Sequence, residues 1–493
     1  MNVKEIVKAL NEIENSYPVE EWQINKIRVW PIIRKMLAAR WSDVEVYHPR
    51  KQSLLKRYGN KIIRLYHLFL LAFKFKRNTL PLCDVDALVF HDNTDRNILL
   101  KDGSWYDHNL DPIVDALNDA NITCMSLERI VLEKKIKAPF YDNSYVINME
   151  LFLHRLKYYW KNRETYSENL NSFDDFSKQL INKYNTVLCK KDVVHYANCV
   201  KIYANYFKTI LIGKKVKVVF LQNWYSLIEH ALSLACSEVS VSAVDVQHGV
   251  AGAGYHDAYN GWKKFPTNKS YELLPSYFLC WTWEDKYSID SWATNYVKAF
   301  CVGKPIEYSM KKIEQLTDAY YLKYFTQSKK VILFSLSWGN DVPEWIINFI
   351  KNNNKEYIWL IRYHPYIDIY QRKFTNALNG NENIIIEGVE NIPLEMLLPR
   401  CYCHITMYSS VVIEANFNGK MSIVVHKDSE YMYGDLIKKG RVLKAYSPEE
   451  LSMSLLKIQN KKIDVSSKED LKQVILDIVV KGSRRSCLTT KLF

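Results

Sequence analysis

The chain has 493 residues, too many for a single hydrophobic core, so we expect two or three packed units. Hydrophobic residues make up 48% of it and charged residues 25%, the balance of an ordinary soluble protein. The ten cysteines lie too far apart for a disulfide framework or a zinc site. The net charge of +13 suits an anionic partner, but the lysines are dispersed and no zinc-finger, RNP or helix-turn-helix pattern is present, so no nucleic acid is expected.

Residues 1–80 are predicted to form a helical N-terminal extension. MNVKEIVKALNEIEN has the pattern of a charged amphipathic helix rather than a signal peptide. Helical spacing continues through INKIRVWPIIRKMLAARW, with a break expected at Pro31. Residues 51–78 contain eight Lys or Arg and no acid, and their apolar centre is too short to span a membrane. They predict either a helix on an anionic membrane surface or a buried helix with solvated basic ends. The expected location is cytoplasmic, and the first alternative places the chain peripherally at the inner face of the cytoplasmic membrane.

Strands and helices alternate from residue 84 onward. The continuous apolar run DVDALVFH (84–91) is typical of a buried parallel strand, and a helix at 110–121 and the strand ITCMSL follow it. A helical region is expected from about 145 to 212. Further strands are then predicted in KVKVVFLQ, SAVDVQ, SYFLCW (276–281) and AFCVG (299–303), with a helix at SLIEHALSLACSEV.

The alternation resumes after a charged helical segment. Strands are predicted in KVILFSLS (330–337), YIWLIRYHP (357–365), NIIIEG, CHITMYSS (403–410) and MSIVVH (421–426), with helices between them and a last helix at KEDLKQVILDIVVKG. The fold class expected is therefore α/β, with two Rossmann-like domains and a cleft between them. The predicted segments are a helical extension at 1–80, a first domain at 81–304, a linker at 305–328, a second domain at 329–465, and a C-terminal helix and tail at 466–493.

The loop in SAVDVQHGVAGAGYHDAY (242–259) follows a predicted strand. GAGYHD begins like a dinucleotide fingerprint, but Asp257 stands where its third glycine belongs, so the signal is weak. The glycines let the loop adopt unusual backbone angles at the carboxyl end of a strand, where open α/β sheets bind ligands. No third ligand accompanies the two histidines, so no metal is expected. The side chains expected near this edge are Asp245, Gln247, His248, His256 and Asp257, with Gly249 in the loop.

Two motifs of the second half fall where strands end. Arg362, His364 and Pro365 form a strand end that is either a plain turn or part of a site. Ser409 and Ser410 stand where a strand gives way to a helix, whose dipole and free N–H groups favour an anion. Glu414 lies one turn further on the same face and suits the ribose hydroxyls of a nucleotide, although a serine N-cap with a solvent-facing glutamate is the alternative.

Four segments carry a resemblance to a known family. VDVQHG (244–249), CVGKPIE (301–307), RYHP (362–365) and YSSVVIEA (408–415) resemble motifs of GT-B glycosyltransferases that build bacterial capsule and lipopolysaccharide. The group includes the bacterial Kdo transferases and other users of CMP-sugars. Lys304 stands where the family usually has Asn.

The resemblance implies a metal-independent glycosyltransferase with a CMP-Kdo-like donor and a lipid-linked glycan acceptor of capsule or lipopolysaccharide type. It needs no cofactor beyond the nucleotide-sugar co-substrate. The base expected to deprotonate the acceptor is His248, with Asp257 and His256 as rivals. A retaining mechanism requires a carboxylate nucleophile instead, from Asp245, Asp257, Asp92 or Asp95. The donor is expected at Arg362, His364, Ser409, Ser410 and Glu414, and the acceptor-side loop is expected to include Gln247, Gly249 and Asp95.

Three alternatives remain open. A CDP-glycerol or CDP-ribitol phosphotransferase of the same fold would leave phosphorus in its product. A sugar-nucleotide epimerase would turn over nucleotide sugar without an acceptor. A non-catalytic assembly partner at the membrane would keep the fold without the reaction.

Overall fold

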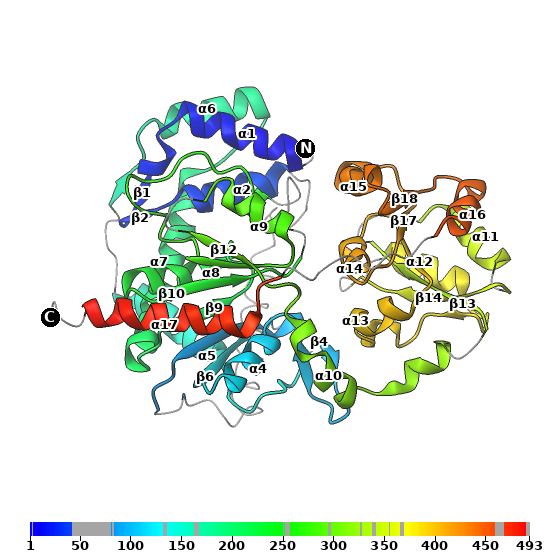
Figure 1. Cartoon of the computed structure of the whole chain (residues 1–493). Helices are drawn as coiled ribbons and strands as arrows, with labels where there is room; N and C mark the ends of the chain where they lie inside the picture. Colours follow the sequence, from blue (N-terminus) through cyan, green and yellow to red (C-terminus); the bar gives the residue numbers. More distant parts are fainter. Residues whose placement is uncertain are drawn as a thin grey trace. The chain divides into compact units, whose positions relative to one another are not determined.

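The computed structural model describes residues 1, 3–41, 80, 83–131, 136–161, 167–249, 251, 257–293, 297–325, 328–337, 342–353, 355–364, 369–458 and 468–489. The basic stretch 51–78, His256 and Pro365 lie outside this range. The chain folds into two compact units (Figure 1). The first contains residues 1–96, 107–309 and 468–493, and the second contains residues 97–106 and 310–467.

The first unit is built on a seven-stranded sheet whose order is β7-β6-β3-β9-β10-β11-β12. All its strand pairs are parallel. Counted along the chain, this order is 3-2-1-4-5-6-7, which begins with the six-strand order of the Rossmann fold. Its strands are β3 (Ala87–Asp92), β6 (Cys124–Arg129), β7 (Ser144–Val146), β9 (Val218–Leu221), β10 (Ser242–Val246), β11 (Tyr277–Cys280) and β12 (Lys298–Cys301).

Helices cover both faces of this sheet because successive strand side chains point to opposite sides. Leu88 and Phe90 enter the core beneath α7 (Lys190–Gly213) and α8 (Leu227–Glu238). Ala87 and Val89 enter the core on the other face, beneath α4 (Asp111–Asp119) and α17 (Leu471–Thr489). Figure 1 shows α17 in red along this unit, so the chain returns to its first unit after completing the second.

The N-terminal segment packs as part of the first unit. It contains α1 (Val3–Ser16), α2 (Trp30–Trp41) and the hairpin of β1 (Gln23–Ile24) and β2 (Ile27–Arg28), to which β8 (Glu168–Asn169) adds a strand. The helix expected through INKIRV is therefore wrong. Asn25 and Lys26 both have positive φ, 51° and 66°, which turns the chain into a hairpin. Pro31 lies in the first turn of α2, where its missing N–H is not needed.

The region 145–212 is not one helical stretch. It starts within β7 and continues as α5 (Asn148–Lys161), β8, α6 (Phe173–Tyr184) and α7. Asn185 ends α6 in the left-handed conformation, with φ 47°.

The second unit is built on a six-stranded parallel sheet with the order β15-β14-β13-β16-β17-β18, which is 3-2-1-4-5-6 along the chain. This is the Rossmann strand order. Its strands are β13 (Lys330–Ser335), β14 (Tyr357–Arg362), β15 (Ile384–Ile385), β16 (Cys403–Thr406), β17 (Ser422–Val424) and β18 (Val442–Lys444). Its helices include α11 (Glu344–Asn352), α12 (Ile369–Leu378), α13 (Leu394–Leu397), α14 (Val411–Phe417), α15 (Ser429–Lys438) and α16 (Pro448–Leu456). The expectation of two Rossmann-like α/β units is confirmed.

Two segments outside the main sheets have secondary structure of their own. The predicted linker forms α10 (Ile306–Leu316) and the 3-10 helix η5 (Ala319–Phe325). A hairpin of β4 (Arg96–Leu99) and β5 (Trp105–Asp107) was not predicted, and most of it belongs to the second unit. The backbone N–H of Lys101 in its turn donates to the carbonyl of Leu316 at 2.9 Å.

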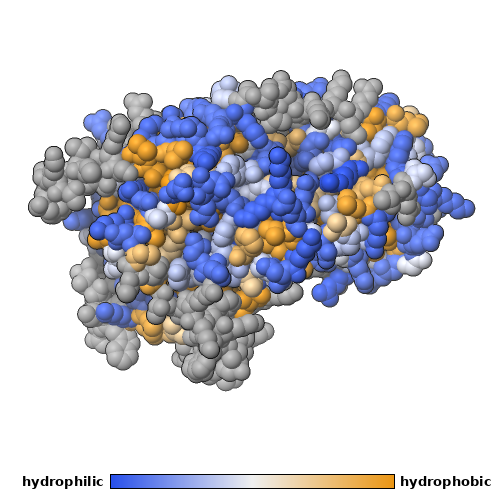
Figure 2. All heavy atoms as spheres, turned by 60° about the horizontal axis from the view of Figure 1, so that its bottom comes forward, coloured by the Kyte–Doolittle hydropathy of each residue, from blue (hydrophilic) through white to orange (hydrophobic). Residues whose placement is uncertain are grey.

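Within the described ranges, no helix has both the length and the apolar character needed to cross a bilayer. On the face that Figure 2 shows, hydrophilic side chains predominate and the hydrophobic ones form small separate patches. The cysteines whose side chains are described are free thiols, and Cys401 and Cys403 are buried.

Candidate active site

Both sheets have a switch point, the position where the strand order reverses. In the first unit it lies between β3 and β9, and in the second it lies between β13 and β16. Ligands of open parallel sheets bind beyond the carboxyl ends of the strands at such points. The segments that follow these four strands are therefore the places to look for a site in each unit.

At the switch point of the first unit, polar side chains follow β3 and β9. Gln222, directly after β9, donates its amide to Asp95 in the loop after β3. Arg129, at the end of β6, donates to Asp92 and lies 3.7 Å from Glu229 in the first turn of α8. The Asp95 position was predicted, whereas Gln222, Arg129 and Glu229 were not.

Two carboxyl groups of this cluster have pKa values well above those of an ordinary carboxyl group. Burial, followed by repulsion from Asp92, raises the pKa of Asp95 to about 8. Burial also raises the pKa of Glu229 to about 7, although the Arg129 guanidinium acts in the opposite direction. One oxygen of Glu229, Oε2, is buried without a hydrogen-bond partner. Near neutral pH these groups can therefore donate as well as accept a proton.

Asp245 lies inside the sheet on β10 and is only 1% exposed. Its Oδ1 accepts the backbone N–H of Trp224 at 3.2 Å, and its Oδ2 accepts the hydroxyl of Tyr259 at 2.8 Å. Burial raises the pKa of Asp245 to about 7. Both oxygens serve the packing of the sheet, so the structure gives this residue no access to a substrate.

The side chain of Gln247 also forms hydrogen bonds within the protein. Its Oε1 accepts the backbone N–H of Trp281 at 2.7 Å, and its Nε2 donates to the carbonyl of Gly249 at 2.7 Å and to Asp285 Oδ2 at 3.0 Å. The glutamine thus fixes the start of the loop that carries His248. An ideal Cβ at Gly249 would meet nothing within 4 Å, so this glycine leaves open space.

His248 lies at the carboxyl end of β10, next to Tyr225. Its Nε2 is 3.3 Å from the Tyr225 hydroxyl, which donates to Asn223 Oδ1 at 3.1 Å. The other ring nitrogen of His248, Nδ1, is buried. Burial and nearby carboxylates hold the pKa of Tyr225 well above its usual value, so its hydroxyl stays protonated.

Lys35 of α2 reaches the same place. Its Nζ lies 4.2 Å from the centre of the Tyr225 ring and 4.0 Å from Asp257 Oδ1. The structure therefore brings His248 and Asp257, both predicted, to one place through two residues that were not predicted, Tyr225 and Lys35. His256 lies outside the described residues.

The N-terminal helices hold the segment that contains Asp257. Glu14 of α1 and Arg34 of α2 form a buried ion pair at 2.5 Å. Arg34 also donates to the carbonyls of Asn260 at 2.5 Å and Asp257 at 3.4 Å, while Glu14 accepts the backbone N–H of Lys263 at 2.5 Å. This bracing is a role for the N-terminal extension that the sequence did not reveal.

In the second unit, hydroxyl groups meet at the switch point. Thr406, at the end of β16, donates to the carbonyl of Ser335 at 2.7 Å and accepts the N–H of Ser409 at 3.1 Å. Ser337, after β13, lies 3.5 Å from the Thr406 hydroxyl and accepts the N–H of Tyr408 at 3.3 Å. Ser409 Oγ accepts the N–H of Val411 at 3.4 Å, and the neighbouring Ser410 is exposed.

Arg362, another residue predicted to bind the donor, holds a nearby turn of the protein. Arg362, at the end of β14, donates through Nη1 to the carbonyls of Val389 at 2.8 Å and Ile392 at 2.5 Å, so it holds the turn around η6 (Val389–Asn391). Burial lowers the pKa of Arg362, and attraction to Glu395 and then Glu414 offsets part of this. Glu414 therefore lies within electrostatic reach of Arg362.

His364 follows β14, and its backbone N–H donates to the buried Gln371 side chain at 2.9 Å. Its partner in the predicted motif, Pro365, lies outside the described residues. Across the described part of the chain, no group of three or more His, Cys, Asp or Glu side chains could hold a metal ion.

No protein-family model matches the chain, and no curated protein matches it. Among solved structures, it is similar to a putative UDP-N-acetylglucosamine 2-epimerase from Listeria monocytogenes, with 13% identity, a TM-score of 0.48, and coverage of 82% of this chain and 97% of that one. It is also similar to the UDP-GlcNAc 2-epimerase from Methanocaldococcus jannaschii, with 16% identity, a TM-score of 0.47, and coverage of 80% and 99%. The glycotransferase of kitacinnamycin gives 9% identity, a TM-score of 0.41, and coverage of 82% and 96%. A likeness this remote assigns neither activity nor substrate.

Proposed function

We propose that the protein is a glycosyltransferase that moves a sugar from a nucleotide-activated donor to a growing surface polysaccharide of capsule or lipopolysaccharide type. The observation that supports this most is the position of Ser409 at the switch point of the second sheet, where the buried hydroxyl of Thr406 accepts its backbone N–H. Ser410 stands beside Ser409 and Glu414 one turn further along α14. Hydroxyl and backbone N–H groups bind phosphate, and a carboxylate binds ribose hydroxyls.

The second unit, in this proposal, binds the donor. Ser409 and Ser410 donate hydrogen bonds that stabilise the leaving phosphate. These hydrogen bonds take the place of a metal ion's positive charge. Glu414 binds the ribose, and His364 and Arg362 complete the donor side. Because Arg362 already holds two carbonyls, its substitution would disturb the η6 turn as well as the nucleotide.

The first unit binds the acceptor. His248 removes the proton of the attacking hydroxyl, and Tyr225 contacts its ring at Nε2. Asp257 and Lys35 lie beside this pair and orient the acceptor. Asp95, which keeps its proton near neutral pH, serves the acceptor side as a hydrogen-bond donor. The net charge of +13 suits an anionic lipid-linked acceptor at the inner membrane face.

The donor favoured by the RYHP and YSSVVIEA motifs is a CMP-sugar of the Kdo type. The experiment that tests it is a thermal-shift titration of the full chain with CMP, CDP, UDP, GDP and dTDP, without and with magnesium. A ligand at a hundred times its Kd stabilises a protein by about 2.7 kcal/mol, so binding is readily seen. Stabilisation by CMP that is indifferent to magnesium is the expected result. A preference for UDP, GDP or dTDP discards the Kdo-type donor, and CDP favours the alditol-phosphate transferase.

Ser410→Ala should weaken the nucleotide response because the exposed hydroxyl is lost from the switch point. The matched control is Ser328→Ala, which removes another exposed serine of the same unit at the opposite end of β13. Equal responses of the two variants would contradict the donor site. Turnover of nucleotide sugar without any acceptor would favour the epimerase instead, and no response to any nucleotide would favour the non-catalytic partner.

A further inference from the structure

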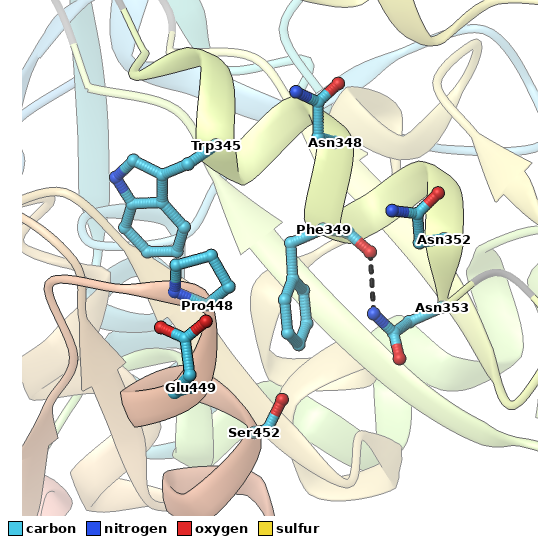
Figure 3. Close-up of a pocket in the computed structure, with 8 residues that line it drawn as sticks. All are labelled: Trp345, Asn348, Phe349, Asn352, Asn353, Pro448, Glu449 and Ser452. Atoms are coloured by element: carbon cyan, nitrogen blue, oxygen red, sulfur yellow. Dashed lines mark hydrogen bonds between the residues drawn. The ribbon is translucent and has the colours of Figure 1, made fainter.

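A separate pocket of about 370 Å³ lies between α11 and α16 in the second unit (Figure 3). This volume is within the range of small-molecule sites. None of the residues proposed for the nucleotide lines it, so it is a different site from the switch point.

An aromatic surface forms part of its wall. Trp345, Asn348, Phe349 and Asn352 recur at the spacing that places side chains on one face of a helix. Phe349 points into the pocket in Figure 3 and packs at 87° against the buried Trp359, with 6.3 Å between ring centroids. The Trp345 ring is partly exposed, so it offers an apolar face to a ligand while its N–H can meet a polar group.

Amide groups surround this aromatic wall. Asn348 and Asn352 are exposed on α11, and Asn353 is anchored by donating to the carbonyl of Phe349 at 2.9 Å. A side-chain amide carries two donors and an acceptor, so it can satisfy a hydroxyl group that both donates and accepts. Ser452 adds a hydroxyl from α16.

The charge of the lining disfavours anionic ligands. Glu449 is its one ionisable residue, and no Lys, Arg or His is among the side chains that line the pocket. Hydrogen bonds from the helix backbone and from Ser447 lower the pKa of Glu449, so it is a carboxylate at neutral pH. A phosphate or a sugar acid would be repelled, whereas neutral hydroxyls can donate to it.

We propose that this pocket binds a neutral sugar residue, with the ring lying against Trp345 and its hydroxyls bonded to Asn348, Asn352 and Glu449. The inference goes beyond the proposed transfer reaction, because it assigns a second carbohydrate site to the unit that holds the nucleotide. Such a site would retain a neutral part of a glycan chain near the protein during its extension.

The test is saturation-transfer difference NMR on the full chain with the methyl glycosides of glucose, galactose, N-acetylglucosamine and N-acetylgalactosamine, and with glucose 1-phosphate as the anionic comparison. We expect transfer to the ring protons of at least one neutral glycoside, whereas any transfer to glucose 1-phosphate should be the same in wild type and in Trp345→Ala. Trp345→Ala should abolish the signal, and the double variant Asn348→Ala/Asn352→Ala should weaken binding at least about tenfold, the loss of about 1.4 kcal/mol. Asn376→Ala, at an exposed asparagine of α12, is the control that should bind normally.

Transfer to none of the neutral glycosides would overturn the proposal, and so would a signal that survives both Trp345→Ala and the double variant. If Trp345→Ala does not fold, the double variant at two exposed positions decides alone. The probes contain no nucleotide, so this outcome is independent of the titration that tests the donor site. Failure of one proposal is therefore distinguishable from failure of the other.

Discussion

The backbone N–H of Trp281, just after β11, donates to the side-chain oxygen of Gln247, just after β10, at 2.7 Å. This bond joins two neighbouring strand ends directly beside His248. The glutamine of the QHG motif therefore shapes the loop, while the histidine after it faces the polar cluster around Tyr225.

Gln247→Leu should destabilise the protein by about 1–3 kcal/mol, because the buried Trp281 N–H loses its acceptor and the Asp285 carboxyl loses one of its two side-chain donors. Urea denaturation measures this loss. Gln315→Leu makes the same change at an exposed position of α10 and should have little effect. A Gln247 variant as stable as this control would mean that the bonds contribute nothing.

Asp245→Asn should change how stability depends on pH. Burial raises the pKa of Asp245 to about 7, whereas a carboxyl in the unfolded chain has a pKa of about 3.9. Between these values the folded state keeps a proton that the unfolded state has released, so wild-type stability falls as pH rises from about 4 to about 7. Asparagine does not titrate, so the variant should gain about 2–3 kcal/mol relative to wild type between pH 5 and pH 8. Denaturation curves at several pH values measure it, with Asp318→Asn at an exposed site as the control, and a difference that stays constant with pH would refute the burial effect.

Arg34→Met should cost about 3–5 kcal/mol, because it leaves the Glu14 carboxylate buried without its cation. The double variant Glu14→Gln/Arg34→Met should lose less than the sum of the two single variants, since it removes both charges. A double-mutant cycle followed by chemical denaturation measures this coupling. Both single variants should also lower transfer activity through the Asp257 segment, while nucleotide binding in the second unit stays unchanged. Additive losses in the cycle would show that the ion pair is not a unit.

Gly261→Ala should be destabilising for two separable reasons. Gly261 has a positive φ of 68°, and a Cβ there would overlap the Val7 side chain of α1. Gly440→Ala has a similar φ of 66° but open space around the Cβ, so it measures the conformational cost alone, about 1–2 kcal/mol. Adding Val7→Ala to Gly261→Ala should recover part of the additional loss. Equal melting temperatures for the two glycine variants would contradict the close approach of α1.

The sequence predicts the strands of both sheets except β7 and β18, because the predicted ones are apolar runs that end in polar residues, as in 84–91 and 330–337. It misses the β1–β2 hairpin, since the apolar spacing of INKIRV fits a helix and only the backbone angles of Asn25 and Lys26 reveal the turn. The three residues of β18 are too few for a periodic signal.

The sequence points to a candidate residue where it lies within three positions of a strand's end, as His248, Ser409 and Asp95 do. Gln222 also follows a strand, β9, so the same signal could have found it. Lys35 could not be found, because α2 reaches Tyr225 through tertiary packing across about 190 residues of chain. The sequence also does not reveal the hydrogen bonds that Asp245, Gln247 and Arg362 form within the protein, because their partners come from other strands and turns.

The return of α17 to the first unit has a consequence for synthesis on the ribosome. The core beneath α4 includes Leu471, Val474 and Ile478, so it stays open until these residues emerge. At about 5–20 residues per second, the roughly 160 residues between Ser309 and Leu471 delay this step by about 10–30 s. During that interval the nascent chain exposes an apolar sheet face, and a chaperone that covers Ala87 and Val89 would be needed most at this stage.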